Sequence, residues 1–333
     1  MKYVKLGKTD MMVSELALGT WAFAGGSFWG EQDERDSAET IAAAIDYGIN
    51  FLDTAEAYER GYSEQVVGKA LKGKRDKVIL ATKVAGAHLA ANEMVGACEE
   101  SLKNLGTDYA DLYYLHWPNM NVPFDETMEA LYQLKKSGKI RAGGISNYGL
   151  KQMEMLDETG MMDMIEAHQL PYNLFWRAIE YGMLQRSLDF NLSIVCYSTL
   201  AQGLLTGRYR SGADVPDNLK VVRFYADLDG TKHGGKGCEE EAFAAVRELE
   251  PLCAEAGLTL PQACLAWLNK QRGVTSLLTG PRNVAELKQN IESVGITISD
   301  EMADKMTAIS EKVRVKIGGN TDMWMNGSKI RTF

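Results

Sequence analysis

The chain is poor in cysteine, and its cysteines lie far apart. Among its 333 residues there are five, and none belongs to a Cys-x-x-Cys pair: Cys98, Cys196, Cys238, Cys253 and Cys264. Isolated thiols of this kind predict neither a zinc site nor a disulfide framework. We therefore expect no bound metal, and we expect the cysteines to be buried, reduced thiols.

An excess of positive charge and long apolar runs are also lacking. The 45 Asp and Glu outnumber the 36 Lys and Arg, giving a formal net charge of -9, whereas a surface for nucleic acid or anionic lipid would be basic. No stretch approaches the roughly 18 apolar residues of a membrane span, and residues 1–8 lack the apolar core of a signal peptide. We expect a cytoplasmic protein that binds a small molecule, with no nucleic-acid or membrane partner. The oligomeric state is left open.

Short apolar runs alternate with longer amphipathic stretches along most of the chain. Strands are expected at 15–20, 50–53, 78–83, 111–117, 140–146, 165–169, 193–197 and 274–278. Helices are expected at 37–47, 63–71, 92–104, 125–136, 150–158, 178–190 and 261–271, with another after 283. Eight strands, each followed by a helix, is the count that closes a (β/α)8 barrel.

We therefore predict an α/β fold, a single (β/α)8 TIM barrel domain over residues 1–333 with its core at about 15–295. Residues 3–6 and 12–14 are expected to form an N-terminal hairpin that plugs the barrel, and residues 208–237 a surface loop before a helix at 239–256. A C-terminal helix at 301–313 and a tail from 318 complete the segment 299–333. An open doubly wound sheet would normally carry a Gly-x-Gly-x-x-Gly turn after an early strand, and none follows one here.

Four polar residues stand at the ends of successive expected strands. Asp53 closes the second strand and Tyr58 follows it, Lys83 closes the third, and His116 lies at the end of the fourth. Chemistry in such barrels takes place at the C-terminal ends of the strands, so adjacent strands would bring these side chains together for proton transfer. Taken singly, each could instead be structural: a helix cap, a surface aromatic, a solvated strand end or a core histidine.

Three blocks of sequence, at 48–58, 112–118 and 138–147, resemble the signature blocks of the aldo-keto reductase superfamily, and the likeness extends from about 3 to about 298. It implies NAD(P)H-dependent reduction of an aldehyde or ketone to an alcohol, or the reverse oxidation. Tyr58 would then be the general acid and base, with a pKa shifted towards the phenolate by Lys83. Asp53 would hold Lys83, and a neutral His116 would orient the carbonyl. The family more often has Gly after this tyrosine, where this chain has Glu59; that departure bears on the loop geometry and not on the chemistry.

The resemblance also implies a nicotinamide cofactor. Ser146, Asn147 and Gln169 would bind its carboxamide, and Tyr197 would stack on its ring. A loop after the seventh strand resembles the family's pyrophosphate-binding loop and comprises Ser198, Leu200, Gln202, Gly203 and Leu204. Gly203 could instead serve only the turn.

After the eighth strand, a further set resembles the family's grip on adenosine and the 2'-phosphate: Gly280, Arg282, Glu286, Gln289 and Asn290. Arg282 would be the charge partner of the phosphate. Thr279 stands where the family usually has Pro, and Glu286 where it has Gln or Arg; a carboxylate there could bond a ribose 2'-hydroxyl and repel a 2'-phosphate. We predict a preference for NADPH, with NADH also accepted.

The substrate is expected to be a small carbonyl or sugar-like compound in a pocket lined by Trp21, Trp117 and Trp324. Two alternatives stay open. One is a cofactor-binding regulatory subunit with little turnover, because the superfamily includes potassium-channel β subunits. The other is a barrel isomerase or aldolase with Lys83 as a Schiff base, which would leave Ser146, Gln169 and Arg282 without a role.

Overall fold

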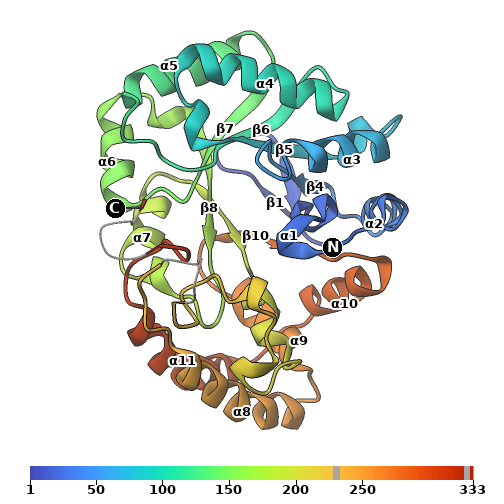
Figure 1. Cartoon of the computed structure of the whole chain (residues 1–333), viewed down its shortest axis with the longest axis vertical. Coiled ribbons are helices and arrows are strands. Elements are labelled where there is room, and N and C mark those ends of the chain that lie inside the picture. Colours follow the sequence, from blue (N-terminus) through green and yellow to red (C-terminus); the bar gives the residue numbers. More distant parts are fainter. Residues whose placement is uncertain (228–232, 326–330, 333) are drawn as a thin grey trace.

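Eight parallel strands close into a barrel in the computed structural model, which describes residues 1–227, 233–325 and 331–332 (Figure 1). They are β3 (Leu16–Gly19), β4 (Phe51–Asp53), β5 (Ile79–Val84), β6 (Ala110–Leu115), β7 (Ile140–Ser146), β8 (Ile165–Pro171), β9 (Ser193–Tyr197) and β10 (Val274–Thr279). Strand β10 pairs with β9 on one side and with β3 on the other, which closes the sheet. The predicted (β/α)8 fold class is confirmed.

Helices surround the barrel and return the chain from each strand to the next (Figure 1). They are α2 (Glu34–Asp46), α3 (Tyr62–Ala70), α4 (Ala91–Leu105), α5 (Phe124–Lys136), α6 (Leu150–Glu158), α7 (Met183–Asp189), α9 (Leu260–Asn269) and α10 (Val284–Val294). The helix expected at 178–190 is shorter than predicted. It starts with a 3-10 turn at Ala178–Glu180, and α7 begins only after Gly182, whose φ of 120° is open to glycine and not to a helical residue.

Local sequence explains where the later helices begin. The Thr259 side chain accepts a hydrogen bond from the backbone N–H of Gln262, and Pro261 occupies the first turn of α9. The Asn283 side chain accepts from the N–H of Glu286 and caps α10 in the same way. Such caps satisfy amides that have no partner within the helix, so α10 begins close to the end of β10, facing the barrel mouth.

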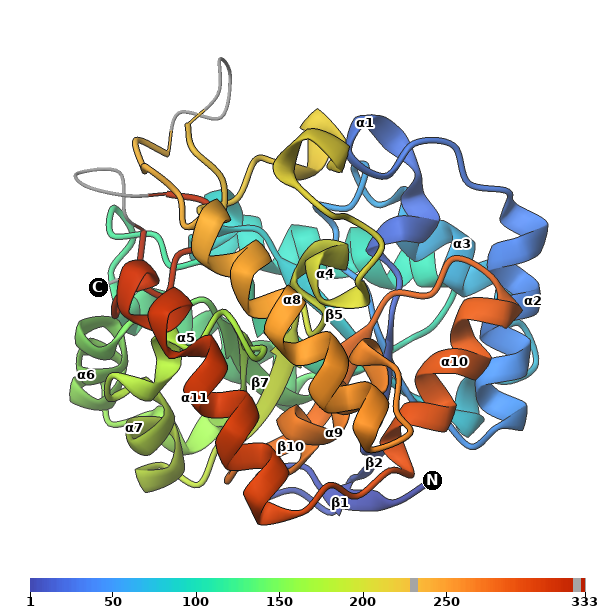
Figure 2. The ribbon, with the colours of Figure 1, turned by 90° about the horizontal axis from the view of Figure 1, so that it is seen from below.

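The N-terminal hairpin, β1 (Tyr3–Lys5) and β2 (Met12–Ser14), lies at one end of the barrel (Figure 2). Leu6, Met11 and Val13 pack in one cluster with the side chains that fill the barrel interior, among them Phe51 and Tyr114. The expected plug is therefore present. It closes one end, whereas α1 (Gly26–Trp29) and the loops that follow the strands lie at the opposite end (Figure 2).

The additions to the barrel are two helices and two irregular segments. Helix α8 (Glu239–Glu255) and helix α11 (Asp300–Ile317) pack side by side, as Figure 2 shows. The expected 208–237 loop contains short 3-10 turns at Gly212–Asp214 and Asp217–Leu219, and its residues 228–232 lie outside the described part, as do 326–330 and 333 of the expected tail. All five cysteines are free and buried, as expected. None of the described helices is long and apolar enough to cross a membrane.

Candidate active site

The four polar residues at the strand ends meet in the structure. Lys83, in β5, donates from Nζ to Asp53 Oδ1 at 2.5 Å, to the Thr54 carbonyl at 2.7 Å and to the Tyr58 hydroxyl at 3.1 Å. Parallel pairing of β4 with β5 sets Asp53 level with Ala81, two residues before Lys83 and on the same face of the strand. Both Asp53 and Lys83 are almost completely buried, at 1% and 0% exposure. Their side chains therefore form an ion pair shielded from water beneath the phenol.

His116 follows β6 and faces the same phenol. Its ring centroid lies 5.9 Å from that of Tyr58, with the two rings at 83°. Burial, and then the positive charges of Lys83 and Arg331, hold the pKa of His116 well below its ordinary value of 6.5. The imidazole is therefore neutral at physiological pH, in agreement with the sequence-based expectation.

Burial dominates the ionisation of the phenol. It raises the pKa of Tyr58 above 10.0, and although the charge of Lys83 lowers that pKa, the charge of Asp53 adds to the rise. The net direction is upward, so Tyr58 keeps its proton at neutral pH. The sequence-based expectation that Lys83 shifts the pKa towards the phenolate was right about the sign of that one interaction, but it did not include the larger cost of burying the charged form.

The ammonium beside it stays charged. Burial lowers the pKa of Lys83, but the charges of Asp53 and Tyr58 and the hydrogen bonds to both together raise it by a larger amount, so the net pKa lies above 10.5. For Asp53, burial raises the pKa by more than the charge and hydrogen bond of Lys83, and then the hydrogen bond from Gln169, lower it, so the net direction is upward. The site thus holds a fixed positive charge within 3.1 Å of the Tyr58 oxygen.

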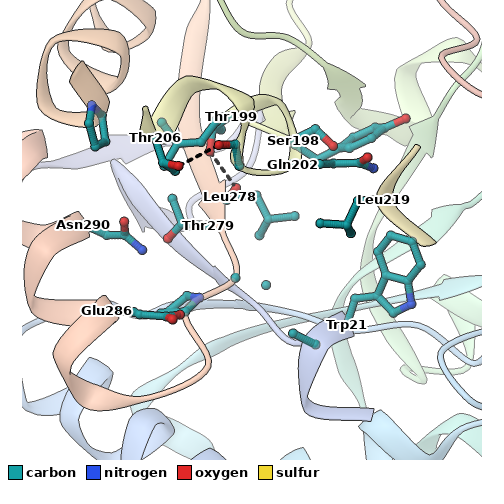
Figure 3. Close-up of a pocket in the computed structure, with 18 of the residues that line it drawn as sticks. Trp21, Ser198, Thr199, Gln202, Thr206, Leu219, Leu278, Thr279, Glu286 and Asn290 are labelled. Atoms are coloured by element: carbon teal, nitrogen blue, oxygen red, sulfur yellow. Dashed lines mark hydrogen bonds between the residues drawn. The ribbon is translucent and has the colours of Figure 1, made fainter. Parts of the chain in front are cut away.

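A cavity of about 1330 Å³ opens above these residues at the C-terminal ends of the strands. Most of the residues predicted for the site line it: Asp53, Tyr58, His116, Ser146, Asn147, Gln169, Tyr197, Ser198, Leu200, Gln202, Gly203, Gly280, Arg282, Glu286, Gln289, Asn290, Trp21, Trp117 and Trp324. Two do not. Lys83 lies beneath Tyr58, and Leu204, 1% exposed, packs in the hydrophobic core beside the loop. Figure 3 shows Ser198 and Gln202 opposite Glu286 and Asn290.

The residues expected to bind a carboxamide form a polar network of their own. Asn147 donates to the His116 carbonyl at 3.1 Å and to Ser146 Oγ at 3.0 Å, and it accepts from the Tyr197 hydroxyl at 2.7 Å. Gln169 Nε2 donates to Asp53 Oδ2 at 2.8 Å. The sequence did not indicate this last bond, which joins the expected cofactor residues to the ion pair.

The loop after β9 carries polar groups that lack a partner within the described residues. Both side-chain polar atoms of Gln202 are buried without one, as is Thr279 Oγ1, at the end of β10. Ser198, Gln202 and Gly203 have φ values of 52°, 53° and 96°, so the backbone bends sharply at the cavity wall. Buried polar groups usually have a hydrogen-bond partner, so this wall fits a polar ligand such as a dinucleotide.

The α10 end of the cavity is held by a residue that the sequence did not single out. Gln32, just before α2, accepts from Arg282 Nε at 2.9 Å and donates from Nε2 to the Arg282 carbonyl at 2.9 Å. Arg282 also donates to the Glu31 carbonyl. The Glu286 carboxylate accepts from the backbone N–H of Arg282 at 2.8 Å. The guanidinium is thereby oriented by a loop 250 residues away in the chain.

Aromatic side chains cover the phenol. The ring of Trp21 stacks on Phe28 and on Tyr58, with centroid separations of 4.6 Å and 5.6 Å. The rings of Trp21 and Trp324 are T-shaped, with centroids 6.1 Å apart. Trp117 instead makes a cation–π contact with Arg331, whose guanidinium carbon lies 3.6 Å from the ring centroid. Phe28 and Arg331 were not predicted, since neither lies in a motif. The closeness of Phe28 to Trp21 in sequence was the one available signal.

Comparison with known proteins identifies the family. The model of the aldo/keto reductase family matches residues 15–311. The chain belongs to this family. It is 38% identical to the aldo-keto reductase YhdN of Bacillus subtilis, over 93% of this chain and 94% of the relative, and 33% identical to an NADH-specific methylglyoxal reductase of Escherichia coli, over 93% and 99%. A crystal structure of a Klebsiella pneumoniae aldo-keto reductase in complex with NADPH superimposes with a TM-score of 0.75 at 28% identity, covering 98% of this chain and 99% of that one.

Family membership confirms the expected class, an NAD(P)-dependent oxidoreductase. A voltage-gated potassium channel β subunit of Arabidopsis thaliana is more distant, at 27% identity over 89% of this chain and 92% of that protein. The departure from the aldo-keto reductase pattern after Tyr58 also has a structural counterpart: Glu59 and Arg60 have φ values of 46° and 56°, a left-handed conformation that favours glycine. These two residues therefore hold the loop at some cost in backbone strain.

Proposed function

We propose that this chain reduces an aldehyde or ketone to an alcohol, or catalyses the reverse oxidation, with Tyr58 as the general acid and base. The observation that carries the proposal is the buried chain of hydrogen bonds from Asp53 through Lys83 to the Tyr58 hydroxyl, at the floor of a cavity large enough for a dinucleotide and a small substrate. The named reductase relatives support the same chemistry.

The protein's part in the reaction follows from the charges. A bound nicotinamide cofactor would supply a hydride to the carbonyl carbon. Tyr58, protonated because its pKa is raised, donates its proton to the carbonyl oxygen as negative charge develops there. The ammonium of Lys83 stabilises the phenolate that results, and Asp53 keeps that ammonium in place. The neutral imidazole of His116 donates one hydrogen bond to the same oxygen.

We propose NADPH as the preferred cofactor, with NADH also accepted. Ser146, Asn147, Gln169 and Tyr197 would hold the nicotinamide end, and the loop from Ser198 to Leu204 the pyrophosphate. At the other end, the Glu286 carboxylate accepts a hydrogen bond from the backbone N–H of Arg282 and not from its side chain. The Arg282 guanidinium, which Gln32 orients, would be the charged partner for a 2'-phosphate. Among relatives, one solved structure holds NADPH and one reductase is NADH-specific, so both forms occur among similar proteins.

Replacing Tyr58 by Phe tests the mechanism. Loss of general acid catalysis is worth about 10²–10⁴ in rate, so kcat for a generic aldehyde should fall by about that factor while NADPH still binds. Tyr62→Phe is the matched control, because Tyr62 is exposed and bonds Glu34 on the outer surface; it should keep the wild-type rate. Equal rates for wild type and Tyr58→Phe would refute the role given to Tyr58.

The two alternatives predict different results in the same assay. A regulatory subunit of the channel β type would bind the cofactor with little turnover in either enzyme. A Schiff base at Lys83 requires a free, neutral amine, whereas this ammonium has three hydrogen-bond acceptors and a raised pKa. Borohydride trapping at Lys83 with a carbonyl substrate would revive that mechanism. The cytoplasmic location and the single-domain organisation stay predictions.

A further inference from the structure

The guanidinium of Arg331, in the C-terminal segment, faces the substrate end of the cavity. Arg331 lines the cavity together with Trp324, and its guanidinium lies over the ring of Trp117, the residue after His116. Its charge contributes to the lowered pKa of His116, which places it within electrostatic range of the reacting centre. Arg331 has no part in the proton transfer from Tyr58.

Arg331 is held rigidly on several sides. Its Nε and Nη2 donate to the two oxygens of Asp322, each at 2.9 Å, and its carbonyl accepts from Gln152 Nε2 at 2.8 Å. Asp322 is fully buried and also accepts from the backbone N–H of Trp324 at 3.0 Å and of Met325 at 3.2 Å. A guanidinium has five donor hydrogens, and the carboxylate uses two of them. Within the described part of the chain, the other three N–H donors have no partner, on a side chain that the Asp322 carboxylate orients.

Among the residues that the structure describes, the charges at this end of the cavity cancel. Asp53 is paired with Lys83 and Asp322 with Arg331, His116 is neutral, and Tyr58 holds its proton. An anionic substrate would meet no net positive charge from these described residues, and its own charge would have to be desolvated against the buried carboxylate of Asp322. A neutral oxygen, by contrast, gains a hydrogen bond from Arg331 without losing a charge–solvent interaction.

We propose that Arg331 is a substrate-specificity residue, which donates a hydrogen bond to a second, uncharged oxygen of the carbonyl substrate, a hydroxyl or a further carbonyl. Asp322 is its positioning residue. The proposal rests on the proposed carbonyl reduction and narrows it, because the aromatic walls made by Trp21 and Trp117 alone would accept a plain aldehyde equally well. A site built to bond a substrate oxygen discriminates strongly against an analogue that lacks it.

Three aldehydes of equal carbon number test the proposal: propanal, glyceraldehyde and glyceraldehyde 3-phosphate. Each is assayed with wild type and with Arg331→Met, which keeps an unbranched apolar stem and removes the guanidinium. A hydrogen bond from a charged group should make kcat/KM for glyceraldehyde fall about tenfold to a hundredfold more than kcat/KM for propanal. Hydration of the aldehydes cancels, since each ratio compares two enzymes on one compound. Arg35→Met, on the exposed surface of α2, is the control and should leave both values unchanged.

Removing Arg331 alone leaves Asp322 buried without its charge partner, so the variant could unfold the segment. The double variant Arg331→Met, Asp322→Asn removes both charges and covers that case, with the thermal midpoint as the check on folding. If kcat/KM falls equally for propanal and glyceraldehyde in the folded variant, Arg331 does not bind a second substrate oxygen and the proposal is wrong. If wild type prefers the phosphorylated aldehyde and Arg331→Met loses that preference, the oxygen that Arg331 binds is charged, and the proposal of an uncharged substrate oxygen is wrong. Failure of wild type to reduce any of the three would count against the proposed function instead.

Discussion

Replacing only one partner of the ion pair beneath Tyr58 should lower the free energy of unfolding. In Lys83→Met, the carboxylate of Asp53 stays buried with Gln169 as its remaining side-chain donor. Breaking a buried pair in this way typically costs about 3–5 kcal/mol. With an unfolding entropy of about 2.1 cal/mol/K for each of the 333 residues, about 0.7 kcal/mol/K in all, the thermal midpoint should fall by about 4–7 °C.

Removing both charges should restore most of that loss. In the double variant Lys83→Met, Asp53→Asn, no unpaired charge is left, and replacement of a buried pair by neutral groups is often close to neutral for stability. Activity should not return, because the phenolate would still lack its cation. Calorimetry at one scan rate, beside an aldehyde reduction assay, measures the two properties separately. Lys69→Met is the matched control: it breaks an exposed pair with Glu34, and its midpoint should equal that of wild type.

Two outcomes would refute this reasoning in different ways. If Lys83→Met unfolds at the wild-type temperature, Asp53 holds no charge in the folded variant, because burial raises its pKa and the lysine that opposed the rise is gone. If the double variant is as unstable as the single one, the loss comes from packing around the methionine and not from an unpaired charge. A double variant with restored stability and no activity would mean that the pair is retained for chemistry.

Two other predictions concern pH and the cofactor. Burial lowers the pKa of His168 to about 3, so between about pH 6.5 and about pH 3 the unfolded chain binds a proton that the folded chain does not. The free energy of unfolding should therefore fall as pH falls through that window, by up to about 1.4 kcal/mol per pH unit. Urea unfolding of the variant His168→Gln should lack this one-proton dependence on pH. Gln32→Ala removes a hydrogen bond that orients Arg282; the ratio of kcat/KM for NADPH to that for NADH should fall about twofold to tenfold, and an equal loss with both cofactors would mean that Gln32 supports only the loop.

The sequence could supply the barrel and the four catalytic candidates because both are local patterns repeated along the chain. Asp53, Lys83 and His116 each end a short apolar run, and in a closed parallel sheet all such ends lie on one rim. The shortened helix around 178–190 also had a local signal, Gly182, which the amphipathic pattern concealed.

What could not be predicted depends on contacts between distant segments. Gln32 meets Arg282 across 250 positions, and Arg331 reaches Trp117 from the end of the chain; no spacing rule connects such pairs. The direction of the Tyr58 pKa was missed for a related reason. A neighbouring lysine can be read from a motif, but the depth at which both groups are buried belongs to the packed structure.

The bond from Gln169 to Asp53 explains why an amide suits this strand end. Lys83 and Gln169 each donate to one oxygen of Asp53, so both oxygens are occupied by donors, which oppose the rise in the pKa of Asp53 that burial causes. An amide that donates through one N–H still has a second N–H and a carbonyl oxygen to offer a ligand in the cavity. A glutamate would have to bring a proton to make the same contact, and a leucine would leave Asp53 with one donor fewer. Glutamine can therefore contact a ligand and support the ion pair at the same time, which makes the expected carboxamide site and the proton relay parts of one network.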